Sequence, residues 1–423
     1  MPETESKPAP PFAACIGLDR SDRQVDICLH VPGSTPQYLV LDNTPEVILP
    51  WLDTLRQNYG GQPVALCLEQ PAGGLLYLLT GHDFLTLYAI NPLTLSKYRT
   101  AFTTSHAKDD PGDAYFLMEL VRDHRDKLPL WQPDEVATRI LASLVAARRQ
   151  AVDVRTQFTN QLQANLKLYF PQALELAGSQ MHSAMACDFL TRWPTLQELQ
   201  RARPNTLLKF YHAHGSRSKA TINARLELLR TSVPLSNDVA LLSTAVLTTD
   251  LLIDQLKPLT AALSKFEQRI DSAVAEHQDG FIFQSLPGAG ALSSARLIAA
   301  MGSDRTRYQT AQDVQNYSGI APVVKKSGKV RLVQRRYRCP KFVHQTFVEY
   351  AAQSIPHCAW AKAYYQQQRG RGCGRYTAVR ALAFKWQRII FTCWQKRVAY
   401  NEATYLAALQ RRHSTLLAGT AAE

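Results

Sequence analysis

Four acidic residues stand where predicted strands end and where a predicted helix begins. Asp19 closes the apolar run PFAACIGLD and Glu69 closes the run VALCLE, and both runs are typical of buried strands. Asp110 and Asp113 lie three residues apart in KDDPGDAYFLMELV, a spacing that places both on one face of a helix. Two strand-end acids and an acidic helix face could hold one or two divalent cations on oxygen ligands, as two-metal phosphodiester chemistry requires.

The elements that would position these acids alternate between strand and helix up to about residue 134. Three strands come first, ACIGLD, VDICLHV and QYLVLDN, and helices then alternate with the strands PVALCLE and FLTLYAIN. This is the order of a ribonuclease-H-like (RuvC-like) domain, so the expected fold and the positions of the acids agree. The fold class is therefore predicted to be α/β at the N-terminus with a mainly helical remainder.

From about residue 135 the apolar period becomes that of long amphipathic helices. A first helix is predicted from apolar residues at steps of three and four, at Val136, Ile140, Leu144, Ala147, Ala151, Val154, Phe158 and Leu162. A second repeats the pattern at Leu252, Leu256, Leu259, Leu263, Phe266, Ile270 and Ala273, and Pro258 is expected to kink it. The pair could form an antiparallel coiled coil, associate between subunits, or pack as ordinary core helices. The stretch of about residues 170–240 between them is interpreted as a helical insertion with no assigned chemistry.

The chain is basic overall, with a formal net charge of +13 and a pI near 9.4. Such a positive field favours a polyanionic partner. No stretch reaches the roughly 18 uninterrupted apolar residues of a membrane span. The eight cysteines show no metal-binding spacing. We therefore expect a cytoplasmic protein with reduced thiols and no membrane partner.

The positive charge is dense near residue 330. Between residues 325 and 341 the chain carries no acid but has eight cations, at Lys325, Lys326, Lys329, Arg331, Arg335, Arg336, Arg338 and Lys341. This segment predicts a contact with a nucleic-acid backbone. Within it, Ser327 precedes Gly328 in a predicted turn. Nearby cations or a metal could activate the serine hydroxyl as a nucleophile, although a Ser-Gly pair by itself is more often only a turn.

A second predicted contact lies in FQSLPGAGALSSARLIAAMG, which has the form of a helix-hairpin-helix turn. Gly288 and Gly290 would let backbone amides approach a phosphate at the start of the following helix. A generic connection between two helices would have the same sequence.

The order of these motifs resembles one known family. IGLD, CLE, KDDPGDA, LPGAGALSSARLIAAMG and YSGIAPVVKKSGK, with the closing basic helix, are similar to the DEDD insertion-sequence transposases that mobilise with a bridge RNA, and to the related Piv-type DNA invertases. The likeness covers about residues 12–168 and 276–395. It implies a RuvC-like domain over residues 1–134, a coiled-coil linker with an insertion over 135–275, and a C-terminal transposase domain over 276–423.

The resemblance also implies the roles of residues. Asp19, Glu69, Asp110 and Asp113 would hold Mg²⁺, and Ser327 would form a transient phosphoserine link to DNA. The implied partners are donor and target DNA, a noncoding bridge RNA, and further copies of the chain in a dimer or tetramer. This chain departs from the family in having Asp109, which could replace Asp110 as the third ligand.

Three alternatives stay open at the level of sequence. Asp110 and Asp113 could be the N-cap and third residue of a helix, where acids are favoured for structural reasons. The enzyme could be a RuvC-like nuclease or junction resolvase that activates water and uses Ser327 only in a turn. The chain could also be a noncatalytic nucleic-acid-binding protein.

Overall fold

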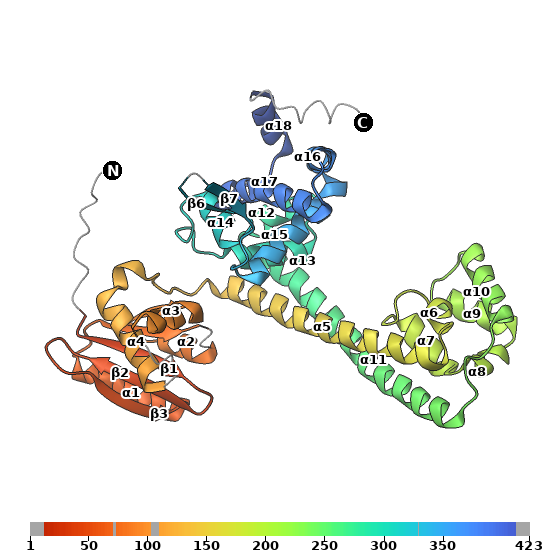
Figure 1. The fold of residues 1–423 in the computed structure, drawn as a ribbon, viewed down its shortest axis with the longest axis horizontal. Coiled ribbons are helices and arrows are strands. Elements are labelled where there is room, and N and C mark those ends of the chain that lie inside the picture. The colour runs from red at the N-terminus through yellow and green to blue at the C-terminus, as the bar shows by residue number, and fades with distance from the viewer. Residues whose placement is uncertain (1–11, 71–72, 103–109, 329, 412–423) are drawn as a thin grey trace. The chain divides into compact units, whose positions relative to one another are not determined.

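The computed structural model describes residues 12–70, 73–102, 110–328 and 330–411, and for Asp110, Pro111 and Ser327 it describes the backbone. The chain divides into two compact units, residues 1–133 and 134–423 (Figure 1). The predicted order is confirmed at this level, because a mixed α/β part at the N-terminus is followed by helices.

A five-stranded mixed sheet forms the centre of the first unit. Its strands are β1 (Ala14–Arg20), β2 (Gln24–His30), β3 (Gln37–Asp42), β4 (Val64–Glu69) and β5 (Leu85–Ile90), in the spatial order β3-β2-β1-β4-β5. The first three strands pair antiparallel, and β1, β4 and β5 pair parallel. The carboxyl ends of β1 and β4 therefore lie side by side at one edge of the sheet.

Helices cover both faces of this sheet. On one face Ile16, Leu18 and Leu66 pack with α1 (Pro45–Asn58) and α2 (Gly73–Thr80). On the other face Cys15 and Cys67 pack with α3 (Pro92–Phe102) and α4 (Asp110–Asp123). A short 3₁₀ turn, η1 (Arg125–Lys127), follows α4. Burial on both faces explains why these strands are continuous apolar runs.

Gly17 lets α4 approach β1 directly. A Cβ atom at residue 17 would lie 1.9 Å from the carbonyl oxygen of Ala114 and 2.3 Å from the amide nitrogen of Met118. Only glycine leaves room for helix backbone at that distance. The glycine in IGLD therefore fixes where the first turns of α4 sit over β1.

Two long helices, α5 (Val136–Tyr169) and α11 (Val239–Glu276), run side by side in the second unit (Figure 1). Three contacts show that they are antiparallel, since the start of α5 meets the end of α11. They are Thr138 Oγ1 to His277 Nε2 at 2.9 Å, Arg148 to Glu267 at 2.5 Å, and Asn165 Nδ2 to Thr249 Oγ1 at 3.0 Å. The two helices thus pair within one chain.

The predicted apolar face of α11 is confirmed, because Leu252, Leu256, Leu263 and Ile270 are buried. By length and composition alone α11 is apolar enough to cross a membrane, and 28% of its most apolar stretch is buried within the protein. Pro258 lies on an exposed position inside the continuous helix.

The predicted face of the first half of α5 was wrong. Val136 and Ile140 are 61% and 42% exposed, whereas Thr138, Leu141 and Val145 are buried. The period was right, but the buried face is rotated by about one residue. Leu141 and Val145 supply an apolar face one residue along, and Thr138 can join it because His277 satisfies its hydroxyl.

Residues 170–238 form a small helical cluster between the two long helices. It consists of α6 (Ala173–Leu176), α7 (Ala184–Arg192), α8 (Leu196–Gln200), α9 (Pro204–Ala213) and α10 (Lys219–Thr231). Its centre is aromatic, with Phe189, Trp193 and Phe210 in edge-to-face contacts. The predicted insertion is therefore a packed helical cluster, and it shares its core with buried residues of α5 and α11.

The helices after α11 pack around a tryptophan-rich core formed by Trp360, Trp386 and Trp394. The elements of this part are α12 (Gly280–Gln284), α13 (Ala291–Met301), α14 (Ala311–Tyr317), β6 (Val323–Ser327), β7 (Val330–Gln334), α15 (Lys341–Ser354), η2 (Ile355–His357), α16 (Ala359–Gly370), α17 (Arg375–Lys396) and α18 (Glu402–Arg411). The β6-β7 hairpin contributes no described residue to that core. All eight cysteines are free thiols, and six of them are buried.

Candidate active site and nucleic-acid interface

Asp19 and Glu69 occupy equivalent places on neighbouring parallel strands. The register pairs Gly17 with Cys67 and Leu18 with Leu68, so Asp19 and Glu69 follow side by side at the carboxyl ends of β1 and β4. Alternation along a strand places Asp19 on the same face as Gly17, which is the face covered by α4. Both side chains are half-buried. The structure thus brings the first two predicted acids together.

Asp113 lies in the first turn of α4, over this same face, and its side chain is buried. The next residue, Ala114, is the one whose carbonyl packs over Gly17. Arg99, in the last turn of α3, donates from Nη1 to both carboxylate oxygens of Asp113, at 2.6 and 2.8 Å. Arg99 was not predicted, since nothing in its local sequence shows which helix α3 packs against.

The backbone of Asp110 begins α4, so the helix starts one residue earlier than the capping alternative requires. Asp109 lies outside the described residues, and the choice between Asp109 and Asp110 as a ligand stays a prediction.

A further acid of this face was missed by sequence reasoning. Asp26 on β2 lies directly opposite Asp19 in the antiparallel register. Directly opposed residues of an antiparallel pair point to the same face, and two like charges there repel each other. The alternating pattern of VDICLHV could have indicated the face of Asp26, but the register with β1 is set only by the folded sheet.

The donor set on this face has the chemistry of a magnesium site, because all of its side chains offer carboxylate oxygens. Among the side chains that the structure describes, however, no three acidic, histidine or cysteine groups gather closely enough to form a metal site. The Asp113 carboxylate is engaged by Arg99. These acids suit a divalent cation in type, and Asp113 would have to share or exchange its arginine partner to bind one.

Ser327 is the last residue of β6, in register with Val330 at the start of β7. Gly328 follows in the predicted turn, and its φ of +57° is a left-handed conformation that glycine adopts without a steric penalty. The hairpin is exposed. From Val324 to Gln334, all residues whose side chains the structure describes are exposed. Ser327 belongs to the second unit, and Asp19, Glu69 and Asp113 belong to the first.

The predicted cations differ in their surroundings. Lys325, Lys326 and Arg331 are exposed on the hairpin, and Arg335 and Arg338 are exposed after it. Lys329 lies outside the described residues. Arg336 is half-buried, and its Nη2 donates to Asn316 Oδ1 at 3.3 Å, so at least part of its role is structural.

The basic region extends well beyond the hairpin. Residues 314–401 contain seventeen lysines and arginines and one acid, a net of +16 that exceeds the +13 of the whole chain. That acid, Glu349, is paired with Arg296. On α17, burial and the nearby Arg335 lower the pKa of the Arg380 guanidinium. The cations of this segment are almost uncompensated by acids, which is the electrostatic character of a polyanion-binding surface.

Gly288 is held by packing. It has φ +75°, and a Cβ atom there would lie 2.6 Å from the His357 ring. Gly290 is the exposed N-cap of α13, with open space around its Cα. The Gly290 amide donates to the Gly288 carbonyl at 3.2 Å, and Gly288 is half-buried. A phosphate contact at this turn stays a prediction.

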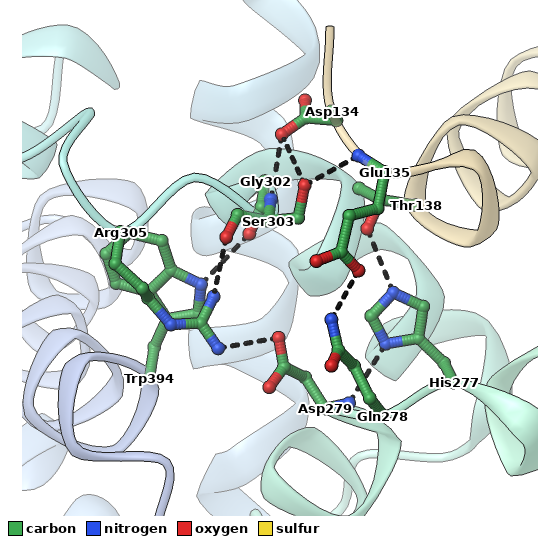
Figure 2. A network of polar contacts seen from close by, with 10 residues as sticks. All are labelled: Asp134, Glu135, Thr138, His277, Gln278, Asp279, Gly302, Ser303, Arg305 and Trp394. Carbon is green, nitrogen blue, oxygen red and sulfur yellow. Dashed lines mark hydrogen bonds and ion pairs between the residues drawn. The ribbon is translucent and has the colours of Figure 1, made fainter.

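A polar network ties the root of the two long helices to the C-terminal core (Figure 2). Asp134 accepts from the amide and hydroxyl of Ser303 at 2.8 and 3.1 Å, and the Glu135 amide donates to Ser303 Oγ at 2.8 Å. Burial alone would raise the pKa of Asp134, but Arg307 and the Ser303 hydrogen bonds together lower it. The carboxylate therefore stays charged and holds the start of α5 against the end of α13.

The same network fixes His277 at the end of α11. The Asp279 amide donates to His277 Nδ1 at 3.1 Å, so the proton of a neutral ring lies on Nε2 and is donated to Thr138 Oγ1 at 2.9 Å. Burial lowers the pKa of His277. Arg305 bonds Asp279 at 2.6 Å and stacks over Trp394, whose indole donates to the Gly302 carbonyl (Figure 2).

Comparison with known proteins now gives the class. Residues 16–171 match a transposase family model of the DEDD IS110 type, and residues 281–366 match the model described as the transposase IS116/IS110/IS902 family. The matched ranges include Asp19, Glu69, Asp113 and Ser327. A transposase cuts and rejoins DNA.

Individual relatives narrow the class to one family. The chain is 30% identical to the mini-circle putative transposase for IS117 of Streptomyces coelicolor, over 82% of this chain and 84% of that protein. It is 25% identical to the IS900 uncharacterized 42 kDa protein of Mycobacterium paratuberculosis, over 83% and 84%. It is 26% identical to the IS116 uncharacterized 44.8 kDa protein of Streptomyces clavuligerus, over 73% and 76%. The protein belongs to the IS110/IS116 family of insertion-sequence transposases.

Proposed function

We propose that this transposase cuts and rejoins DNA through a serine–DNA link formed by Ser327, with Asp19, Glu69, Asp113 and Asp110 as metal-binding acids of a ribonuclease-H-like domain. One observation carries the proposal. Asp19 and Glu69 stand side by side at the carboxyl ends of parallel strands, under the helix that bears Asp113. The strand order, three antiparallel strands followed by parallel ones, supports the ribonuclease-H-like assignment.

In this proposal the serine hydroxyl gives up its proton and its oxygen bonds to a backbone phosphorus atom. The bond from phosphorus to one bridging oxygen breaks, and the released DNA hydroxyl takes a proton. Mg²⁺ held by the acids would supply positive charge that stabilises the pentavalent transition state. The phosphate ester to the DNA oxygen is exchanged for a phosphate ester to the serine oxygen. Because the two esters are similar in energy, the reverse step can rejoin DNA without ATP.

The basic C-terminal region supports binding of a long polyanion. A charge of +16 spread over residues 314–401 is more than one short DNA contact needs, and this excess is compatible with both DNA and a guide RNA. We therefore keep the bridge RNA, with donor and target DNA, as the proposed partners of an oligomeric enzyme.

The test is capture of the covalent link. Full-length protein is incubated with labelled DNA, Mg²⁺ and RNA transcribed from the flanking noncoding segment, then denatured and resolved by size. Wild-type protein should carry label and Ser327→Ala should carry none. The matched control is Ser34→Ala, which changes an exposed serine in another turn.

Two outcomes would decide against the serine. Labelled DNA attached to Ser327→Ala would place the nucleophile elsewhere. Cleavage by Ser327→Ala at the wild-type rate, with no attached protein in either sample, would favour metal-activated water and a nuclease or resolvase. Omitting the RNA tests guidance separately, since an unguided recombinase would form the link without it.

A further inference from the structure

Arg99 contacts one of the proposed metal-binding acids directly. Its Nη1 lies 2.6 and 2.8 Å from the two carboxylate oxygens of Asp113. The side chains of Arg99 and Asp113 are 20% and 4% exposed, so solvent screens this ion pair poorly. Both oxygens through which Asp113 could bind a cation are therefore already engaged by a cation of the protein itself.

Helix α3 is held in place for this contact. The neighbouring residue, Tyr98, donates to Glu119 Oε2 on α4 at 3.2 Å, and Leu95 is buried in the core that α3 shares with α4. Arg99 therefore projects toward the N-terminal end of α4 from a helix docked along it. At the other end of α4, Arg122 pairs with Asp123 and Glu119 and has no contact with Asp113 among the interactions described.

A buried carboxylate needs a partner, because leaving one charge buried alone is strongly destabilising. The partner can be an arginine or a metal ion, and both are positive. An arginine and a metal ion at one carboxylate would repel each other, so the two compete for Asp113.

We propose that Arg99 is a built-in counter-ion of Asp113 that competes with the divalent cation, so that metal binding at the strand-end acids requires Arg99 to release Asp113. This inference rests on the proposed role of Asp19, Glu69 and Asp113 as ligands. Arg99 acts as a positioning residue, since it keeps Asp113 in place over β1 and sets how readily the carboxylate accepts a metal.

The experiment measures metal binding without DNA. Mn²⁺ is titrated into full-length wild-type protein and Arg99→Gln, and affinity is followed by calorimetry and by the electron paramagnetic resonance of free Mn²⁺. Loss of a cation within contact distance should tighten Mn²⁺ binding by about tenfold or more. Arg122→Gln, the matched control on α4, should bind as wild type does.

Thermal unfolding gives a second readout that catalysis does not influence. Without metal, Arg99→Gln should melt below wild type because Asp113 has lost its partner. Saturating Mn²⁺ should raise its melting temperature more than that of wild type. If Arg99→Gln does not fold, Arg99→Lys keeps a charge with poorer geometry and should show both effects at smaller size.

The outcomes separate this inference from the proposed function. If Asp19→Asn abolishes Mn²⁺ binding but Arg99→Gln leaves it unchanged or weaker, the competition is overturned and the metal site is retained. If Arg99→Gln is unfolded, the same comparison is made with Arg99→Lys. Wild-type binding that Asp19→Asn and Glu69→Gln do not weaken would overturn the metal site itself. Tighter binding in Arg99→Gln, with Arg122→Gln unchanged, is the expected result.

Discussion

The two regions that carry the proposed chemistry are built in opposite ways. Asp19 and Glu69 end strands that are buried on both faces, under a helix whose backbone touches β1 at Gly17. Ser327 is the last residue of β6 in a two-stranded hairpin, and the residues from Val324 to Gln334 whose side chains are described are all exposed. A sheet of five strands with two cores holds its side chains in fixed positions, whereas an isolated two-stranded hairpin is only marginally stable in water. The acids thus lie on a packed sheet, whereas the serine lies on an exposed hairpin.

The strongest test of this comparison removes an acid from the rigid region. Asp19→Asn should lower DNA cleavage by about a thousandfold, because in the proposed site it removes a metal ligand and the negative charge that attracts the metal ion. Its melting temperature should stay close to that of wild type, since asparagine has almost the same shape. Cleavage rates on labelled DNA and a thermal melt provide both numbers.

Asp26→Asn is the matched control, since Asp26 faces Asp19 across the same strand pair. It should slow cleavage by less than about tenfold if Asp26 only adds to the local negative field. An equal loss in both variants would make Asp26 a ligand of similar weight.

Glycine substitutions compare the two backbones directly. Gly17→Ala should destabilise the first unit by about 3 kcal/mol, because the new Cβ overlaps the Ala114 carbonyl. Gly328→Ala should cost about 1 kcal/mol locally, for its φ of +57° alone, since nothing lies within 4 Å. Urea unfolding with segment-resolved hydrogen exchange would measure each. Equal costs at the two sites would contradict the close packing of α4 on β1.

Charge removal probes the exposed region. The triple variant Lys325→Ala, Lys326→Ala, Arg331→Ala should weaken nucleic-acid binding and reduce the slope of log affinity against log salt by about 3, near 0.9 per lost phosphate contact. Binding measured by fluorescence anisotropy across a salt series gives the slope. The hairpin is exposed, so the melting temperature should hardly change.

A triple alanine variant of exposed arginines outside residues 314–401, at Arg149, Arg201 and Arg230, controls for net charge. It should leave the slope within about 1 of wild type. A decrease as large as that of the hairpin variant would mean that total charge, rather than the hairpin, determines binding.

The smallest expected effect concerns His277 at the root of the long helices. Burial lowers its pKa in the folded state, so below the unfolded value of about 6.5 the unfolded chain binds more protons than the folded one. Stability should therefore fall as pH drops from about 7 to about 5.5. The stability of the His277→Gln variant should fall less over that pH range. Equal slopes of melting temperature against pH in the variant and the wild type would rule out this contribution.

Much of the first unit could be predicted from its sequence. Runs such as VALCLE are apolar up to the final acid because both faces of the sheet are covered. Such a run can be recognised in the sequence without knowing which strands lie beside it. The stripe of α11 was also correct. The predicted buried face of α5 was wrong. Hydropathy favours burial of Ile140 and exposure of Thr138, but Thr138 is buried beside the His277 ring, which bonds its hydroxyl, and Ile140 is exposed.

The sequence by itself determined which residue types are available for the proposed chemistry: acids near strand ends, a serine in a basic turn, and a long segment almost free of acids. These are local properties, readable from neighbours along the chain. Only the tertiary structure decided that Asp19 and Glu69 share a face, that Asp26 opposes Asp19, and that Arg99 holds Asp113. Strand register and helix docking bring together residues far apart in the chain. The energy of each such contact depends on both residues, so it cannot be read from the local sequence of one.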